Sequence, residues 1–344
     1  MRPQHVGICS AMNPPAFACF LSISMTALSA MSPSLAQAGE KALTDGLSVS
    51  FKTDWSRERQ RQTSEASAST TKGVKQTFTI SRALQADRSA GVDFTHTDLR
   101  QVTDRFAPGF SEAGTLKRDS FEANAFFEFQ HMGVTVKPSV RLGFDDYQLS
   151  RPDTLVTGSF PGFGQMARAK SSGFHAGANL EVSAILPLSG SLFLRPIADI
   201  DYSYLTVKPF SETGATVTLS GYGTVSGNAA FDRVVDERVT SQIGAAVAAR
   251  LAVSDEFLLT PFLQARYRHN FNTAPISTHA ALIANPAMEQ EAVLAVAEEA
   301  DGLILDAGAF LAGAGNWEVL AVYEGKFFPS LTGQTFSGRL RMSF

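Results

Sequence analysis

The chain alternates between hydrophobic and polar residues over long stretches, and residues 333–344 show the pattern most simply. From residue 336 on, apolar residues and glycine take the even positions, and polar or basic residues take the odd positions: Phe336, Gly338, Leu340, Met342 and Phe344 against Ser337, Arg339, Arg341 and Ser343. A period of two puts the two sets on opposite faces of a β-strand. We therefore predict a strand with one hydrophobic face and one charged face.

The same alternation predicts twelve strands in all. They lie at residues 46–55, 73–81, 89–98, 118–130, 133–146, 172–186, 191–204, 237–251, 256–269, 302–313, 316–326 and 333–344. Most are longer than the roughly five or six residues usual in globular sheets, and they reach the roughly nine to eleven that a tilted strand needs to cross a bilayer. Strand length therefore favours a membrane β-barrel over a soluble sandwich.

Long and short connections alternate between these strands until the last one. Residues 205–236 form a long connection, for example, and residues 252–255 form the short one that follows. Outer-membrane barrels have long external loops, short periplasmic turns and an even number of strands. We predict one closed 12-stranded antiparallel barrel with both mature termini in the periplasm. Because an open edge cannot be satisfied in hydrocarbon, strand 46–55 should pair with strand 333–344.

The first 38 residues have the features of an export signal. Arg2 is their only charged residue apart from histidine, an apolar run covers residues 16–30, and Ala36-Gln37-Ala38 has the small-residue form of a cleavage site. We predict a signal peptide at 1–38, a short periplasmic lead-in at 39–45 and the barrel at 46–344.

Composition argues against several kinds of chemistry. Both cysteines, Cys9 and Cys19, fall in the predicted signal peptide, so the mature chain offers no disulfide and no cysteine ligand. Without Arg2, 28 basic side chains stand against 33 acidic ones, which gives no reason to expect nucleic acid. The histidines lack metal-ligand spacing and no GxSxG motif occurs. We predict no catalytic, metal or cofactor site.

Charged residues on the polar face of the predicted strands should point into the barrel. The candidates for lumen-facing positions are Lys137, Arg141, Glu181, Arg195, Asp199, Asp201, Arg266, Arg268, Asp306, Arg339 and Arg341. Both signs occur, as in a hydrated lumen. Two interpretations stay open: these residues either satisfy one another in a polar wall or form a selectivity ring around a conducting path.

Several segments carry a family resemblance. They are residues 194–204 (LRPIADIDYSY), 210–215 (FSETGA), 259–262 (LTPF) with Tyr267, 316–327 (NWEVLAVYEGKF) and the terminal Phe344. From Gly46 to Phe344 the chain resembles the autotransporter β-domain, the 12-stranded translocator of type V secreted proteins. Leu340, Met342 and Phe344 look like the barrel-assembly signal of outer-membrane proteins. In that signal, glycine is usually five residues before the end and an aromatic residue two before it; here Gly338 is six before, and Met342 holds the aromatic place.

The resemblance implies outer-membrane lipid, barrel-assembly machinery and periplasmic chaperones as partners. Residues 39–45 are too few for a passenger or for a helix that fills a pore. We therefore expect a translocator-type barrel without its own passenger, and a separately encoded passenger is a further partner to consider. The alternative is a small pore, or an adhesin-like barrel that acts through its long external loops.

Three local features complete the prediction. Residues 56–72 and 205–236 are expected to be loops, with Thr216 to Val225 extending a hairpin. Residues 286–300 begin at a proline, are rich in acids and predict a short helix that caps or enters the mouth. The expected aromatic girdle on the outer face consists of Trp55, Tyr147, Phe174, Tyr202, Tyr204, Tyr267, Trp317 and Tyr323.

Overall fold

The computed structural model describes residues 46–61, 68–103, 114–152, 166–219, 223–295, 299–313 and 316–344. The predicted signal peptide at 1–38 and lead-in at 39–45 lie outside this part of the chain. The structure therefore does not test the expectation that the chain has no passenger of its own. Within the described ranges, no helix has the length and apolar character that a membrane-spanning helix needs.

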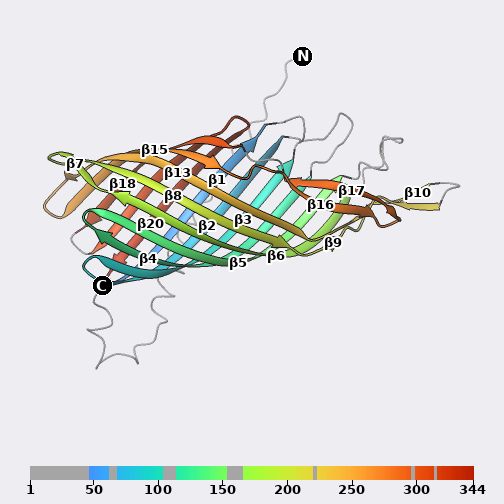
Figure 1. Cartoon of the computed structure of the whole chain (residues 1–344), viewed down its shortest axis with the longest axis horizontal. Coiled ribbons are helices and arrows are strands. Elements are labelled where there is room, and N and C mark those ends of the chain that lie inside the picture. Colours follow the sequence, from blue (N-terminus) through green and yellow to red (C-terminus); the bar gives the residue numbers. More distant parts are fainter. Residues whose placement is uncertain are drawn as a thin grey trace, which may run out of the picture. The chain divides into compact units, whose positions relative to one another are not determined.

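Twelve antiparallel strands form a closed barrel, as the alternation predicted (Figure 1). Each pairs with the next in chain order, and the last pairs with the first. They are β1 (Leu47–Gln60), β2 (Ser69–Gln85), β3 (Arg88–Thr103), β4 (Thr115–His131), β5 (Val134–Pro152), β6 (Met166–Ala184), β8 (Leu192–Val207), β13 (Val234–Ala249), β15 (Phe257–Asn270), β18 (Asp301–Gly313), β19 (Trp317–Phe327) and β20 (Leu331–Ser343).

The seam between β1 and β20 closes the sheet. Its register runs from Ser48 opposite Ser343 to Gln60 opposite Leu331. Beyond the ladder, the Phe344 amide donates to the Leu47 carbonyl over 2.8 Å. The predicted pairing of the first and last strands is therefore confirmed, and no barrel strand keeps a free edge.

The two ends of the barrel differ. At one end, which we call the turn end, short connections join neighbouring strands at residues 86–87, 132–133, 185–191 and 250–256, and Gly313 lies opposite Trp317. Gly46 and Phe344 also lie there. Met132 and Gly133 have positive φ angles of 50° and 79°, which suits a tight hairpin turn. The opposite end, the loop end, carries the long connections.

The outer face is hydrophobic, and the described girdle residues sit on it with one exception. Trp55 and Phe336 pack there in a tilted arrangement with ring centroids 5.9 Å apart, and the Phe257 and Trp317 ring centroids are 6.0 Å apart near the turn end. Tyr147 was wrongly predicted to face lipid. It has the same parity as Asp145 and packs inside the loop end against Val207 and Val234, where only 9% of it is exposed.

Several strands extend further towards the loop end than predicted. Residues 57–60 and 69–72 belong to β1 and β2, so the predicted loop at 56–72 is wrong at both ends; residues 62–67 are outside the described part. Beyond the apolar band both faces of a strand are polar, which removes the alternation. The backbone ladder continues regardless of that side-chain pattern.

A second, four-stranded sheet continues one wall of the barrel at the loop end. It contains β9 (Phe210–Ser211), β12 (Ala229–Phe231), β16 (Ile276–Leu282) and β17 (Asn285–Ala295) in the order β17-β16-β12-β9. These strands follow or precede β8, β13, β15 and β18 along the chain and repeat their spatial order. The hairpin expected at 216–225 is confirmed as β10 (Thr216–Leu219) and β11 (Gly223–Ser226).

The predicted helix at 286–300 is wrong. Residues 285–295 form β17, which pairs with β16, and residues 296–298 lie outside the described part. A proline followed by acidic residues is typical of a helix start, but it says nothing about a neighbouring strand. Here β16 offers a free edge, and the ladder to it outweighs the local preference.

Candidate functional site

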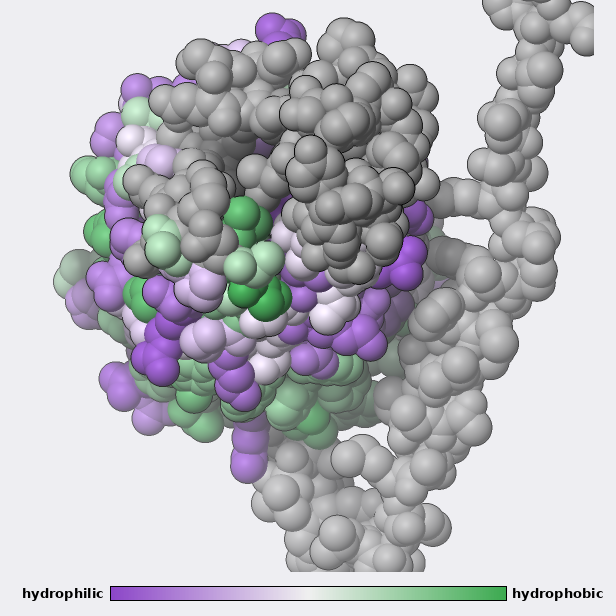
Figure 2. All heavy atoms as spheres, turned by 90° about the vertical axis from the view of Figure 1, so that its right-hand side faces the viewer, coloured by the Kyte–Doolittle hydropathy of each residue, from purple (hydrophilic) through white to green (hydrophobic). Residues whose placement is uncertain are grey.

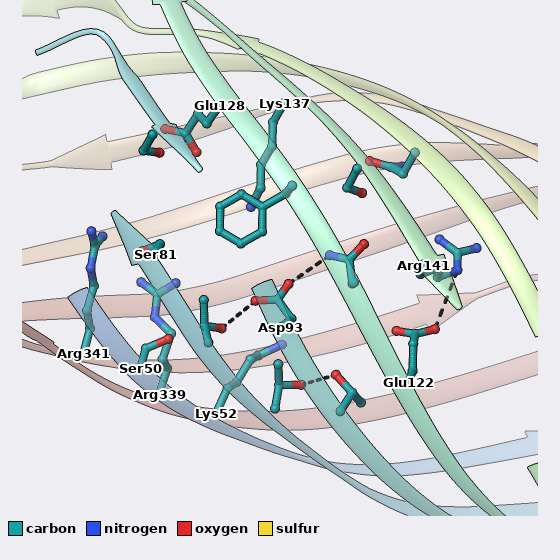
Figure 3. Close-up of a pocket in the computed structure, with 18 of the residues that line it drawn as sticks. Ser50, Lys52, Ser81, Asp93, Glu122, Glu128, Lys137, Arg141, Arg339 and Arg341 are labelled. Carbon is teal, nitrogen blue, oxygen red and sulfur yellow. Dashed lines mark hydrogen bonds and ion pairs between the residues drawn. The ribbon is translucent and has the colours of Figure 1, made fainter. Parts of the chain in front are cut away.

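The interior wall of the barrel encloses a polar cavity of about 570 Å³ (Figure 3). Strands β1 to β6, β8 and β20 contribute its lining. Five of the predicted lumen-facing residues lie on it: Lys137, Arg141, Asp201, Arg339 and Arg341. With Lys52, Lys75, Asp93, Glu122 and Glu128, the lining carries six basic and four acidic side chains.

A smaller cavity of about 240 Å³ has the opposite balance. Three acidic residues, Glu181, Asp199 and Asp201, and one basic residue, Arg268, line it. Arg195 lies nearby on β8 and donates to Glu181 over 3.2 Å and to the Ser183 hydroxyl over 3.1 Å. The wall formed by β6 and β8 is therefore more acidic than the wall formed by β20, β1 and β2.

Arg141 lies along the wall instead of crossing the lumen. From β5 it reaches over β6 to Asp201 on β8, with two hydrogen bonds of 2.6 and 2.8 Å. The strand it crosses carries Gly177, where an added Cβ would lie 2.6 Å from the guanidinium. The missing side chain makes room for the arginine, so a bidentate ion pair forms without narrowing the bore.

A second wall-hugging group surrounds His175. Its Nδ1 lies 2.9 Å from Asp145 and its Nε2 lies 3.2 Å from Glu122. The ring passes over Gly143, where an added Cβ would come within 2.3 Å of it. Arg118 donates to Asp145 over 2.9 Å, and the Asp145 side chain is completely buried. Glu122 and Asp145 share the inward parity of the predicted lumen-facing residues, although they are not among those candidates, and nothing in the sequence singles out His175 or Arg118.

The wall formed by β13 to β19 is the most densely cross-linked. Arg266 donates to Gln242, Asp306 and Glu324, each over 2.9 Å, and thereby joins four strands. Lys326 on β19 then reaches over Gly333 to Glu58 on β1 at 2.7 Å. Of the sequence candidates, Arg266 and Asp306 meet directly here.

Inward-facing aromatic residues lie nearer the turn end. Phe262 and Phe310 have ring centroids 5.5 Å apart, and the Arg339 guanidinium lies 5.8 Å from the Phe310 centroid. Arg339 also donates to Glu318 over 2.6 Å. On the neighbouring wall, the Lys137 ammonium lies 4.4 Å from the centre of the Phe126 ring. These rings lie beneath cations on the wall, which is a favourable arrangement.

Leu340 and Met342 project from the outer face of β20. They lie opposite Phe51 and Val49 on β1 and are 40% and 38% exposed. Phe344 follows the last strand and is 50% exposed. The three side chains thus form an apolar strip along the seam at the turn end.

The described residues contain no group of three or more His, Cys, Asp or Glu side chains arranged to hold a metal ion. Most of their interior charges are instead tied to one another in pairs and triplets. Such an arrangement suits a hydrated wall.

Comparisons with known proteins agree with this architecture. The family model of the autotransporter beta-domain matches residues 49–324. No curated protein matches significantly. Among solved structures, the translocator domain of the autotransporter NalP from Neisseria meningitidis is 14% identical, with a TM-score of 0.66 and coverage of 96% of this chain and 97% of that one.

Two further solved structures have the same fold. The beta domain of the Bordetella autotransporter BrkA is 17% identical with a TM-score of 0.59, covering 87% of this chain and 100% of that one. The transport unit of AIDA-I from Escherichia coli is 9% identical with a TM-score of 0.50, covering 86% and 90%. With its closed 12-stranded barrel and a family match over most of its length, this chain belongs to the autotransporter β-domain family.

Proposed function

We propose that this outer-membrane barrel provides a hydrated route through its lumen, which an extended polypeptide segment can follow, and that it performs no catalysis. The observation that supports this most directly is the placement of long charged side chains over glycines. Arg141 over Gly177 and His175 over Gly143 lie flat on the wall and leave a cavity of about 570 Å³ beside them. A wall of paired charges keeps the lumen hydrated, and because these side chains lie flat, they take up little of its cross-section.

The proposed orientation puts the turn end in the periplasm and the loop end outside the cell. Gly46 and Phe344 both lie at the turn end, and barrels of this kind keep short turns and termini in the periplasm. The lumen-facing residues predicted from the sequence would then line the translocation path. Leu340, Met342 and Phe344 would present the assembly signal to barrel-assembly machinery and chaperones on the periplasmic side.

An inserted linker of about 40 residues that carries an epitope near its start, placed between residues 40 and 41, tests this proposal, because residues 41–45 alone are too short to cross the lumen. If the lumen passes a polypeptide, the epitope becomes accessible to antibody on intact cells. A matched epitope placed at residues 132–133, in a turn, should stay inaccessible until the outer membrane is permeabilised. An epitope at 40 that remains hidden while the barrel is folded would contradict translocation, and exposure of the epitope at 132–133 would contradict the orientation.

A second candidate is a small ion-conducting pore. Side chains at the loop end favour a mouth that is partly covered: Ile276 of β16 packs onto Tyr147, Val207 and Val234 on the inner wall. The β16–β17 hairpin is thereby anchored to the inside of the barrel.

Replacing residues 276–295 by a short Gly-Ser linker should raise single-channel conductance in planar bilayers severalfold, because that anchor is removed. Shortening the β10–β11 hairpin is the matched control and should change conductance little. Unchanged conductance after the first deletion would contradict the covered mouth, whereas no conductance in either protein would contradict the pore.

A further inference from the structure

The outer face of the barrel carries a row of five basic residues near the loop end, interrupted on β5 by Gln148. Strand pairing places Arg57 opposite Lys72, Lys72 opposite Arg100, Arg100 opposite Lys117, Lys117 opposite Gln148 and Gln148 opposite Lys170. All six side chains are exposed and point away from the lumen. We call these residues the basic row. At about 4.8 Å per strand, it extends over roughly 24 Å of the surface from β1 to β6.

These cations have no ion-pair partner within the described part of the chain, unlike most cations of the lumen. None of the five basic residues has a carboxylate of the described residues within 4.0 Å, whereas Arg141, Arg195, Arg266 and Arg339 inside the barrel each have one. Four of the five, Arg57, Lys72, Arg100 and Lys117, lie opposite one another on adjacent strands, where like charges repel. A surface that keeps them together without partners is suited to an anionic ligand.

The rows beneath the basic row give its depth in the membrane. Two residues closer to the bilayer, Asp98, Asp119 and Asp146 lie opposite one another. Two residues further towards the bilayer lies a row of aromatic side chains on the apolar band, formed by His96, Phe121, Phe144 and Phe174. Figure 2 shows hydrophilic residues at the loop end and hydrophobic ones on the side of the barrel behind them. The basic row thus lies at the level of lipid headgroups.

Because the strands are tilted, the basic row is inclined to the membrane plane. Arg57 lies two residues beyond Trp55, whereas Lys170 lies four residues beyond Phe174, a difference of about 7 Å along a strand. The cations therefore cover a range of depths. Such a range suits a headgroup that carries phosphates at more than one level above its acyl chains.

A groove adjoins the basic row on β4, β5, β6 and β9. It has a volume of about 480 Å³, and its only charged lining residues are the bases Lys117, Arg168 and Lys170. The rest of the lining consists of five polar residues, Thr115, Gln148, Ser150, Ser211 and Thr213, and two apolar ones, Leu149 and Ala169. Lysine and arginine bind phosphate by charge-assisted hydrogen bonds, and hydroxyl and amide groups suit sugar hydroxyls.

We propose that the basic row and this groove bind the phosphorylated glycolipid of the outer leaflet, with lipid phosphates on the cations and headgroup sugars in the groove. The proposal rests on the orientation given above, which places the loop end outside. It commits to the lipid as the source of phosphate because the row lies directly above the apolar band.

The test measures binding of rough lipopolysaccharide to the folded mature protein in detergent micelles by native mass spectrometry. The variant Arg100→Gln/Lys117→Gln/Lys170→Gln should bind at least about tenfold more weakly, since each Lys or Arg near an anionic surface contributes roughly fivefold. The control Lys52→Gln/Lys75→Gln/Arg341→Gln removes the same charge from inside the lumen and should bind within about twofold of the wild type. Heat-modifiable migration reports folding of both variants.

Further arms identify the ligand chemistry. Dephosphorylated lipopolysaccharide should bind the wild type and the row variant equally weakly, and Arg100→Lys/Lys117→Arg/Lys170→Arg should bind like the wild type. Should the triple glutamine variant fail to fold, Lys117→Gln alone should weaken binding roughly threefold to fivefold. Equal binding of phosphorylated and dephosphorylated lipid, or displacement of the lipid by millimolar inorganic phosphate, would overturn the proposal. Binding in micelles does not depend on orientation, so it fails separately from the epitope test.

Discussion

The two halves of the lumen wall handle charge differently. Around Arg266, on β13 to β19, each charge has several partners, and four strands are joined through one guanidinium. On the part of the large cavity formed by β20, β1 and β2, the contacts are sparser. Arg341 donates only to the Ser48 hydroxyl, over 3.0 Å, among the hydrogen bonds of the described residues. The half around Arg266 is cross-linked by ion pairs, whereas the half around Arg341 presents basic side chains to the water of the lumen.

We interpret this difference as a division of roles: the cross-linked half stabilises the wall, and the other half sets the electrostatic potential of the lumen. Removing one partner of a partly buried ion pair strongly lowers the stability of a protein. Removing a hydrated surface charge changes the stability little. A wall that must hold its curvature benefits from the first kind of contact. A wall that faces a passing ion or polypeptide benefits from the second, since its charges remain available.

The largest effect should come from Arg266→Ala. This change leaves Asp306 and Glu324 facing each other without their cation, and their side chains are only 7% and 23% exposed. The free energy of unfolding should fall by about 3 kcal/mol. Urea unfolding in lipid vesicles, followed by loss of the fast-migrating unboiled band, measures it. Arg341→Ala in the open half is the control and should cost less than about 1 kcal/mol; equal losses would contradict the division between the two halves.

A middle-sized effect is expected for Gly177→Ala. The added Cβ would meet the Arg141 guanidinium at 2.6 Å and push it off the wall, away from Asp201. The loss should be about 1 kcal/mol, because the arginine can move, and single-channel conductance should fall as the side chain enters the bore. Gly338→Ala is the matched control, because an added Cβ there has no atom within 4 Å. Unaltered conductance in Gly177→Ala would show that Arg141 does not narrow the path.

The smallest change in stability should accompany Arg341→Gln. Removing a hydrated cation from the open half should alter the free energy of unfolding by less than about 0.5 kcal/mol. It should nevertheless shift the reversal potential in a salt gradient towards cation selectivity, and the shift should shrink at high salt, where screening is stronger. Lys170→Gln removes the same charge from the outer face and should leave the reversal potential unchanged. A shift of equal size in both variants would contradict a role for Arg341 in the lumen.

Much of the barrel follows from side-chain parity. The alternation of Phe336, Leu340 and Met342 with Arg339 and Arg341 indicates a strand with a lipid face and a water face, and the same rule located all twelve barrel strands. It also placed Asp145 and Glu122 on the inner wall. Parity works here because lipid and water impose opposite demands on the two faces.

The remainder depends on contacts that parity does not encode. Arg141 and Asp201 are 60 residues apart, and only the register across β6 brings them together. Tyr147 lies beyond the apolar band, where an aromatic residue can pack inside the mouth as well as in a girdle. For residues 286–300 the deciding factor was a neighbouring strand edge, which a local helix signal does not reveal.

The seam has a consequence for biogenesis. Residues at the very start and very end of the domain, such as Ser48 and Ser343, are neighbours across it, so the pairing that completes the cylinder joins positions nearly the whole domain apart. Closing so long a loop is entropically unfavourable and slow. Until β20 pairs with β1, the sheet has two edge strands whose backbone N–H and C=O groups cannot form hydrogen bonds with lipid. A chain truncated before β20 would leave β1 and β19 with unpaired edges, so we expect it not to remain stably in the bilayer.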